Sequence, residues 1–212
     1  MMSKTRLEMF SDGVLAIVIT LLVIEIRPPE VGEHESLASA LWDLWPSYVG
    51  YALSFLIVGV LWLNHHRIFE PVRVVDGPLL LLNLNLLLWA VLIPFPTSVL
   101  AEYLPDGGAH ARTAMALYAG VILVTAASFV ALYSWITHGE RLVHVLPVRS
   151  VVRKARIRFA VGLGVYAAAF ALSWLSPPAA LIVHAGMALY YLFDQTALAG
   201  HDTTTIQPRV IV

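Results

Sequence analysis

The stretch LEMFSDGVLAIVITLLVIEI, from Leu7 to Ile26, decides the fold class of this chain. It is long enough to cross a bilayer as a helix, because about 20 apolar residues span the roughly 30 Å hydrocarbon core. Ser11 and Asp12 nevertheless lie near its start, and Glu25 lies near its far end. A charged group inside hydrocarbon costs roughly 2.5–3.5 kcal/mol even on the lenient insertion scale. We therefore expect Asp12 to face protein or water.

The composition of the whole chain agrees with a membrane protein. Of the 212 residues, 59% are hydrophobic and only 13% are charged, whereas soluble domains are about 25% charged. Cysteine is absent, which excludes a disulfide framework, a thiolate metal site and a cysteine nucleophile. The first stretch is not expected to be a cleaved signal peptide, because Asp12 interrupts its apolar part and no small-residue cleavage site follows.

Six stretches of the sequence are long and apolar enough to span a membrane. We predict an all-α integral membrane protein with one domain over residues 1–212 and spans at about 7–26, 47–66, 79–101, 113–136, 157–176 and 179–199.

Prolines are expected to shape these spans because proline cannot continue a helical hydrogen-bond ladder. Pro28-Pro29 should end the first span, and Pro46 should lie in the first turn of the second. Pro94 and Pro96 should bend or break the third span. Pro177-Pro178 is predicted to form a tight turn between the fifth and sixth spans.

The basic residues predict the orientation. Eleven of the 13 lie on one side of the six-span arrangement. They are Lys4, Arg6, Arg67, Arg73, Arg141, Arg149, Arg153, Lys154, Arg156, Arg158 and Arg209. By the positive-inside rule both termini are cytoplasmic, and an even number of crossings agrees with this. We expect a multi-pass protein of the cell membrane.

Polar residues gather in the cytoplasmic halves of the first three spans. They are Ser11 and Asp12 in the first, Asn64, His65 and His66 in the second, and Asn83 and Asn85 in the third. Asp12 could accept hydrogen bonds from an asparagine, a histidine or Arg6, which would fasten the first span to the next two. It could instead be a solvated helix cap in a first turn. The first three spans are expected to form an inner layer and the last three a lipid-facing outer layer.

Ile17, Thr20, Leu21 and Ile24 form one stripe on the first helix, at the i, i+3, i+4, i+7 spacing. In a helix that is apolar all round, such a stripe by itself indicates contact with lipid or with the protein core. The acids Glu25, Glu30, Glu33 and Glu35 follow it. They could form a solvated loop, or they could concentrate cations at an outer mouth.

Arg6-x-x-x-Phe10-Ser11-Asp12-Gly13, at the start of the first span, resembles the opening motif of the transmembrane protein 175 family, to which the endolysosomal potassium channel of animals belongs. The end of the second span (Trp62…His65-His66…Phe69) and the third span, with Asn83 and Pro94-Phe95-Pro96, are also similar to that family. The last three spans match in number and placement only. The animal protein carries two six-span units and this chain carries one, so it looks like the prokaryotic single-repeat form.

The resemblance implies a potassium-selective cation channel. Four copies would surround a central pore, and each would contribute its first helix. Ile17, Leu21 and Ile24 would form the constriction, and Thr20 would contribute to potassium preference. The sequence contains no T-V-G-Y-G-like filter whose carbonyls could replace the hydration shell. Rings of Ile and Leu could instead close the pore by dewetting.

Other activities have less support. His65 and His66 point about 100° apart on a helix, so they are not expected to bind one metal ion, and no cofactor is implied. No motif indicates an enzyme, and the basic residues are explained by orientation and by lipid headgroups rather than by nucleic acid. The main alternative is a proton- or cation-coupled transporter that uses Asp12 with His65 or His66. A structural membrane subunit is a third possibility.

Overall fold

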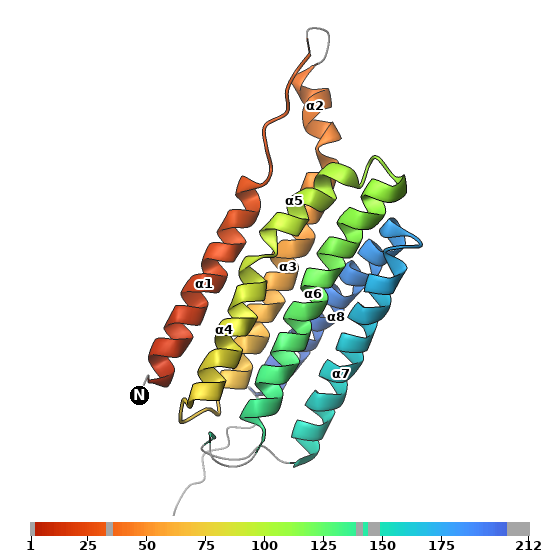
Figure 1. Ribbon diagram of the computed structural model, residues 1–212. Helices are drawn as coiled ribbons and strands as arrows, with labels where there is room; N and C mark the ends of the chain where they lie inside the picture. The colour runs from red at the N-terminus through yellow and green to blue at the C-terminus, as the bar shows by residue number, and fades with distance from the viewer. Residues whose placement is uncertain (1–2, 33–35, 139–141, 144–148, 203–212) are drawn as a thin grey trace, which may run out of the picture.

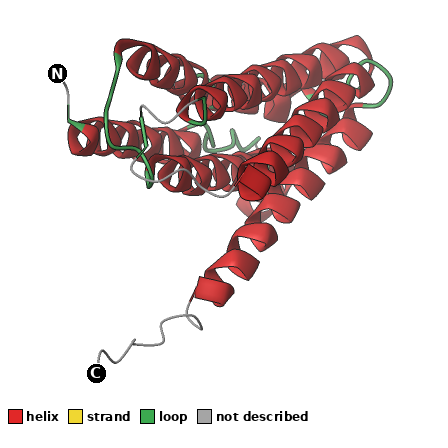
Figure 2. Cartoon of the chain, turned by 90° about the horizontal axis from the view of Figure 1, so that it is seen from below, coloured by secondary structure: helices red, strands yellow, loops and turns green. Residues whose placement is uncertain are grey.

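A computed structural model of the protein describes residues 3–32, 36–138, 142–143 and 149–202. Within these ranges the chain is a bundle of α-helices (Figure 1). The helices are α1 (Lys4–Ile24), α2 (Leu37–Asp43), α3 (Trp45–Phe69), α4 (Gly77–Val91), α5 (Pro94–Tyr103), α6 (Gly108–Ile136), α7 (Arg149–Leu172) and α8 (Pro177–Asp202). Figure 2 shows helices joined by loops, and the described residues add only an isolated β-bridge between Val72 and Val143.

The long helices correspond to the six predicted spans. Five of them are long and apolar enough to cross a membrane, and α8 contributes a shorter apolar segment, Pro177–Phe193. The third crossing consists of α4 and α5 together, Gly77–Tyr103. As predicted, it is interrupted just before Pro94, because Pro94 and Pro96 cannot donate to the helical ladder. The all-α membrane architecture predicted from the sequence is confirmed.

Two predictions about proline are wrong in detail. The helix α1 ends at Ile24, four residues before Pro28, so Pro28-Pro29 lies in the following loop. Pro177 and Pro178 open α8 instead of forming the turn before it. The turn is made by the preceding residues, and the side chain of Ser176 accepts a hydrogen bond from the amide of Ala179 (3.4 Å). Proline suits the first turn of a helix, where its missing N–H has no partner to lose.

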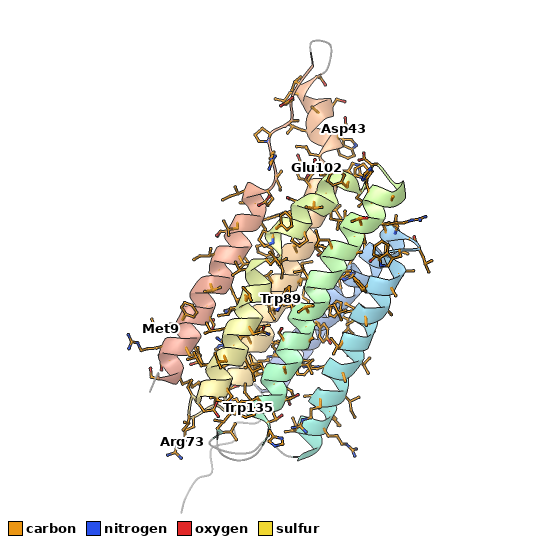
Figure 3. The ribbon with its side chains drawn as sticks, viewed as in Figure 1. Met9, Asp43, Arg73, Trp89, Glu102 and Trp135 are labelled. Carbon is orange, nitrogen blue, oxygen red and sulfur yellow. The ribbon has the colours of Figure 1, made fainter. Side chains whose placement is uncertain are left out.

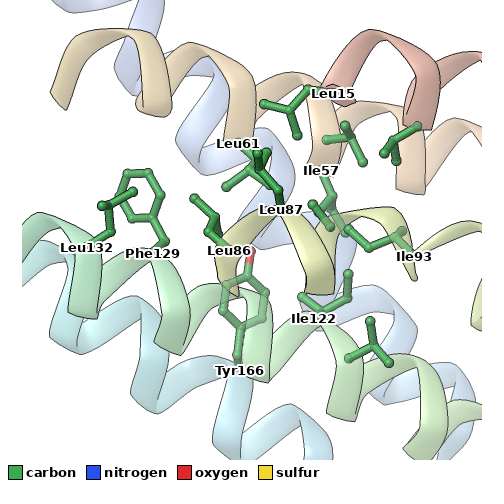
Figure 4. Close-up of a cluster of buried hydrophobic side chains, with 14 of the residues drawn as sticks. Leu15, Ile57, Leu61, Leu86, Leu87, Ile93, Ile122, Phe129, Leu132 and Tyr166 are labelled. Atoms are coloured by element: carbon green, nitrogen blue, oxygen red, sulfur yellow. The ribbon is translucent and has the colours of Figure 1, made fainter. Parts of the chain in front are cut away.

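The centre of the protomer is α6 and not one of the first three spans. It is the most buried of the long helices, and it packs against α4, α5, α7 and α8. Phe129 and Ile122 of α6 meet Leu61 of α3 and Leu86 of α4 in the core (Figure 4). Within one protomer the expected layering is therefore wrong, because the small side chains of α6 let several neighbours approach it at once.

Both α1 and α7 lie at the edges of the bundle, at opposite sides of it (Figure 1). They are the least buried of the long helices. The two ends of the bundle also differ in charge. Figure 3 labels Arg73 near the end where α1 begins, and Asp43 and Glu102 near the other end.

Candidate functional site

The helix α1 has one face in the bundle and one face outside it. Its buried side chains are Leu7, Ser11, Leu15, Val18 and Leu22. Ile17, Leu21 and Ile24 lie on the outer face, and 58%, 37% and 69% of their surfaces are exposed. At 100° per residue the two faces are centred about 115° apart around the helix axis. The stripe noted in the sequence is thus the part of α1 that the protomer leaves uncovered.

Thr20 lies on the same exposed face. Its hydroxyl donates to the carbonyl oxygen of Ile17 at 2.8 Å. Because the single hydroxyl proton is used within the helix, the oxygen's lone pairs remain available to the outside. The exposed face therefore combines large aliphatic side chains with one side-chain hydroxyl oxygen.

A buried polar network joins α1 to α3 and α4. The side-chain amide of Asn83 donates to the hydroxyl of Ser11 at 2.9 Å, and the oxygen of the same amide lies 2.8 Å from His65 Nε2. Ser11 in turn donates to the carbonyl oxygen of Leu7 at 2.9 Å. None of the three side chains is more than 1% exposed. The polar residues of the first three spans are predicted from the sequence to meet, and the structure brings these three together.

The positions of the protons in this network follow from which atoms can donate and which can only accept. The Ser11 proton goes to Leu7, so Ser11 accepts from the Asn83 amide nitrogen. The Asn83 oxygen can only accept, so His65 must carry a proton on Nε2. The His65 ring also stacks on Phe69, with ring centroids 4.4 Å apart. All three polar side chains have partners, which is the condition for burying them.

Asp12 is bonded to a residue outside the predicted set of partners. Its carboxylate accepts a hydrogen bond from the indole N–H of Trp62 at 2.9 Å. We expected an asparagine, a histidine or Arg6 as the donor. The bond nevertheless fastens α1 to α3, as expected for Asp12. Both side chains are exposed in the single chain. The choice of Trp62 follows from the helix geometry, because Asp12 points away from the buried Ser11–Asn83–His65 network.

The remaining candidate residues lie outside the network. Arg6 and Phe10 fall on the exposed side of α1, and His66 is exposed on α3. Asn64 donates to the carbonyl oxygen of Val60 within its own helix (3.0 Å). Asn85 donates to Ser128 of α6 at 2.8 Å and so fastens α4 to the centre of the bundle instead of to α1.

A second polar cluster was missed by sequence reasoning. Ser54 of α3 lies 2.8 Å from the Thr97 hydroxyl of α5 and 3.2 Å from the Tyr118 hydroxyl of α6. Thr97 donates to the carbonyl oxygen of Ile93 at 2.8 Å, so Ser54 donates to Thr97 and accepts from Tyr118. Hydroxyl residues scattered in apolar spans gave no signal that these three would meet.

The end of the bundle beyond α1 carries a polar cleft. It has a volume of about 370 Å³, and its lining includes Glu25, Asp43 and Glu102 together with Arg27. Glu30 is exposed. Glu33 and Glu35 lie outside the described residues. In the described part of the chain no three His, Cys, Asp or Glu residues are grouped so that they could hold a metal ion.

These features define a class: a multi-pass helical membrane protein whose first helix is held by polar contacts and presents an apolar face outside the protomer. The profile of the family described as the endosomal/lysosomal potassium channel TMEM175 matches residues 6–94, from α1 to the start of α5. A potassium channel of Streptomyces collinus is 41% identical over 190 residues, which cover 90% of this chain and 92% of that protein. The chain belongs to the TMEM175 family.

Solved structures and animal relatives extend the comparison. The crystal structure of a lysosomal potassium-selective channel TMEM175 homologue from Chamaesiphon minutus has a TM-score of 0.81 and 38% identity, and the match covers 91% of this chain and 97% of that one. The endosomal/lysosomal proton channel TMEM175 of Gallus gallus is 40% identical over 110 residues, which cover 48% of this chain but only 22% of that protein. The similarity to the bacterial proteins thus extends over all the spans.

Proposed function

We propose that this chain is a potassium-selective channel, assembled as a homotetramer in which four copies of α1 line a central pore. The observation that carries the proposal is the exposed face of α1, with Ile17, Thr20, Leu21 and Ile24. This face points away from the bundle, so a conduit lined by it requires further copies of the chain. Potassium is proposed as the permeating ion because the similar bacterial proteins are named potassium channels.

The side chains of this face suggest how the pore selects and closes. Rings of Ile17, Leu21 and Ile24 would exclude water when the pore is narrow, and a dewetted constriction stops ions. When the pore is wider, an ion must shed part of its hydration shell to pass. Potassium gives up water more readily than sodium, and the Thr20 oxygens replace some of that water. Selectivity of this kind is moderate.

Charge supports an orientation for the channel. The basic residues gather at the end where α1 starts, and by the positive-inside rule this supports cytoplasmic termini in a protein of the cell membrane. The acids Glu25, Asp43 and Glu102 then lie at the outer end of the bundle. Their summed field raises the local cation concentration near the mouth of the proposed pore.

A coupled transporter that uses Asp12 with His65 or His66 has less support. Asp12 is bonded to Trp62, whereas His65 is bonded to Asn83, so the two groups belong to separate contacts. His66 is exposed on α3 and lies outside the buried network. Furthermore, α1 is a continuous helix from Lys4 to Ile24, without the mid-membrane break typical of transporters.

The test is a current recording from the purified full-length chain in lipid vesicles. With potassium and sodium on opposite sides, we expect a current whose reversal potential gives a potassium-to-sodium permeability ratio above one. A separate recording with only a proton gradient measures proton permeation. This measurement is included because the animal relative is named a proton channel. Saturating transport coupled to a second ion would indicate a transporter. Absence of any flux would indicate a subunit that needs a partner, and either result would reject the proposal.

A further inference from the structure

A groove lies between α7 and α8. Figure 1 shows α7 at the edge of the bundle opposite α1. Its volume is about 460 Å³. On α7 it is lined by Lys154, Ile157, Arg158 and Val161, at the i, i+3, i+4, i+7 spacing of one helix face, together with Gly162. On α8 it is lined by Met187, Tyr190 and Tyr191. Two helix faces thus form the two walls of one groove.

The groove is basic at one end and apolar along the rest. Lys154 and Arg158 lie in the first three turns of α7, at the basic end of the bundle. Ile157 and Val161 are more than half exposed, and together with Met187 they line the part of the groove that extends toward the middle of the bundle. Exposed aliphatic side chains on a membrane-spanning helix would contact acyl chains in a bilayer. A groove that is cationic at one end and apolar along the rest is complementary to a molecule with an anionic head and a hydrocarbon tail.

The floor of the groove is fixed by a close contact. The Tyr191 hydroxyl lies so near Gly162 that even a methyl group on that glycine would collide with it. The same hydroxyl lies 3.5 Å from the carbonyl oxygen of Arg158, to which it donates. Tyr191 is buried, and Tyr190 beside it is half exposed. The missing side chain at Gly162 therefore lets α8 dock closely under Arg158, which holds the basic end of the groove in place.

We propose that this groove is a binding site for an anionic phospholipid, with its phosphate at Lys154 and Arg158 and one acyl chain along Ile157, Val161 and Met187. Basic pockets between transmembrane helices at the cytoplasmic surface bind anionic headgroups in this way. The guanidinium carbon of Arg158 lies 5.0 Å from the centroid of the Phe159 ring, and its terminal nitrogens can donate to phosphate oxygens. The exposed hydroxyl-bearing ring of Tyr190 lies at the same level and suits an interfacial position. The site does not depend on the proposed pore, because it lies across the protomer from α1.

The test is native mass spectrometry of the purified full-length protein titrated with phosphatidylglycerol and, separately, with phosphatidylcholine. We expect the wild type to retain phosphatidylglycerol more tightly. The variant Lys154→Gln/Arg158→Gln should lose about fivefold in affinity for each charge removed, or roughly 25-fold in all. Its affinity for phosphatidylcholine should be nearly unchanged, which also shows that the variant is folded.

A matched control removes the same charge from the same end of the bundle. Arg153→Gln/Arg73→Gln eliminates two exposed cations that do not line the groove, and we expect it to bind phosphatidylglycerol as the wild type does. A second variant, Val161→Trp, fills the apolar part of the groove and should weaken binding of phosphatidylglycerol without changing any charge. Inorganic phosphate at the lipid concentration should not compete, because it lacks the acyl chain.

Three outcomes would overturn the proposal. If the control variant loses as much affinity as the groove variant, only the summed surface charge attracts the lipid. If Val161→Trp leaves binding unchanged, no acyl chain occupies the groove. If inorganic phosphate displaces the lipid, the basic end is a site for free anions.

Discussion

The amide of Asn83 on α4 holds the hydroxyl of Ser11 on α1 at 2.9 Å, and neither side chain is exposed. Ser11 lies six residues before Ile17, which is less than two helical turns. A rotation or slide of α1 against α4 would break this bond and leave buried polar groups without partners. The contact therefore fixes which face of α1 points outward.

Replacement of Asn83 by leucine tests this role. Asn83→Leu removes the donor to the Ser11 oxygen and the acceptor for the Nε2–H of His65, and we expect a loss of stability of about 1–2 kcal/mol. The measurement is the midpoint of thermal unfolding of the purified protein in detergent. Thr113→Val is the control, because Thr113 is exposed and bonds only to its own helix, at Ala109. Equal midpoints for the two variants would contradict a structural role for the network.

The contact between Asp12 and Trp62 gives a second prediction. Asp12→Ala removes the acceptor from α1, and we expect it to reduce the fraction of assembled tetramer more than it changes ion selectivity. Trp62→Phe keeps an aromatic ring but removes the N–H donor, and it should have a smaller effect in the same direction. The measurement is the oligomeric state by size-exclusion chromatography with light scattering.

A double-mutant cycle isolates the contact itself. If the hydrogen bond matters, the effect of Trp62→Phe should largely disappear in an Asp12→Ala background. Normal tetramers with an altered potassium-to-sodium ratio would show instead that Asp12 acts on permeation.

Much of this architecture could be predicted from the sequence, for identifiable reasons. Apolar length alone indicates the spans, and proline chemistry indicates the break before Pro94. The cost of burying an asparagine or a serine in an apolar helix made it predictable that Ser11, His65 and Asn83 would meet.

What could not be predicted depends on three-dimensional packing. The central position of α6 arises from how many neighbours its small side chains admit, which no local pattern reveals. Trp62 has one N–H donor on a large apolar ring, so in the sequence it looks like an interfacial aromatic residue. Its bond to Asp12 could be predicted only if the rotation of α1 relative to α3 were known. The Ser54–Thr97–Tyr118 cluster is similar, because it joins three helices far apart in the sequence.

The exposed aliphatic stripe gives a third prediction. Ile17→Ala and Leu21→Ala should each widen the constriction, raise the conductance and bring the potassium-to-sodium permeability ratio closer to one, because a wider apolar ring stays wet. Neither change should lower the thermal midpoint much, since both side chains are outside the core. Current recordings in vesicles with two cations measure the effect. Val23→Ala is a matched control, because Val23 is also exposed but lies off the stripe. Unchanged conductance in both variants would contradict the proposal that Ile17 and Leu21 line the pore.

Thr20 separates the contribution of oxygen from that of pore width. Thr20→Val keeps the branched shape and removes the hydroxyl, whose proton goes to the carbonyl oxygen of Ile17 and whose lone pairs point outward. The fold should tolerate the change, because the lost hydrogen bond lies within one exposed turn. The preference for potassium should fall while the conductance stays of the same order, since the ring loses its oxygens without becoming wider. Thr20→Ser, which retains the oxygen, should keep most of the preference. If the valine and serine variants show the same permeability ratio in two-cation recordings, the hydroxyl has no part in selection and the aliphatic rings must account for it alone.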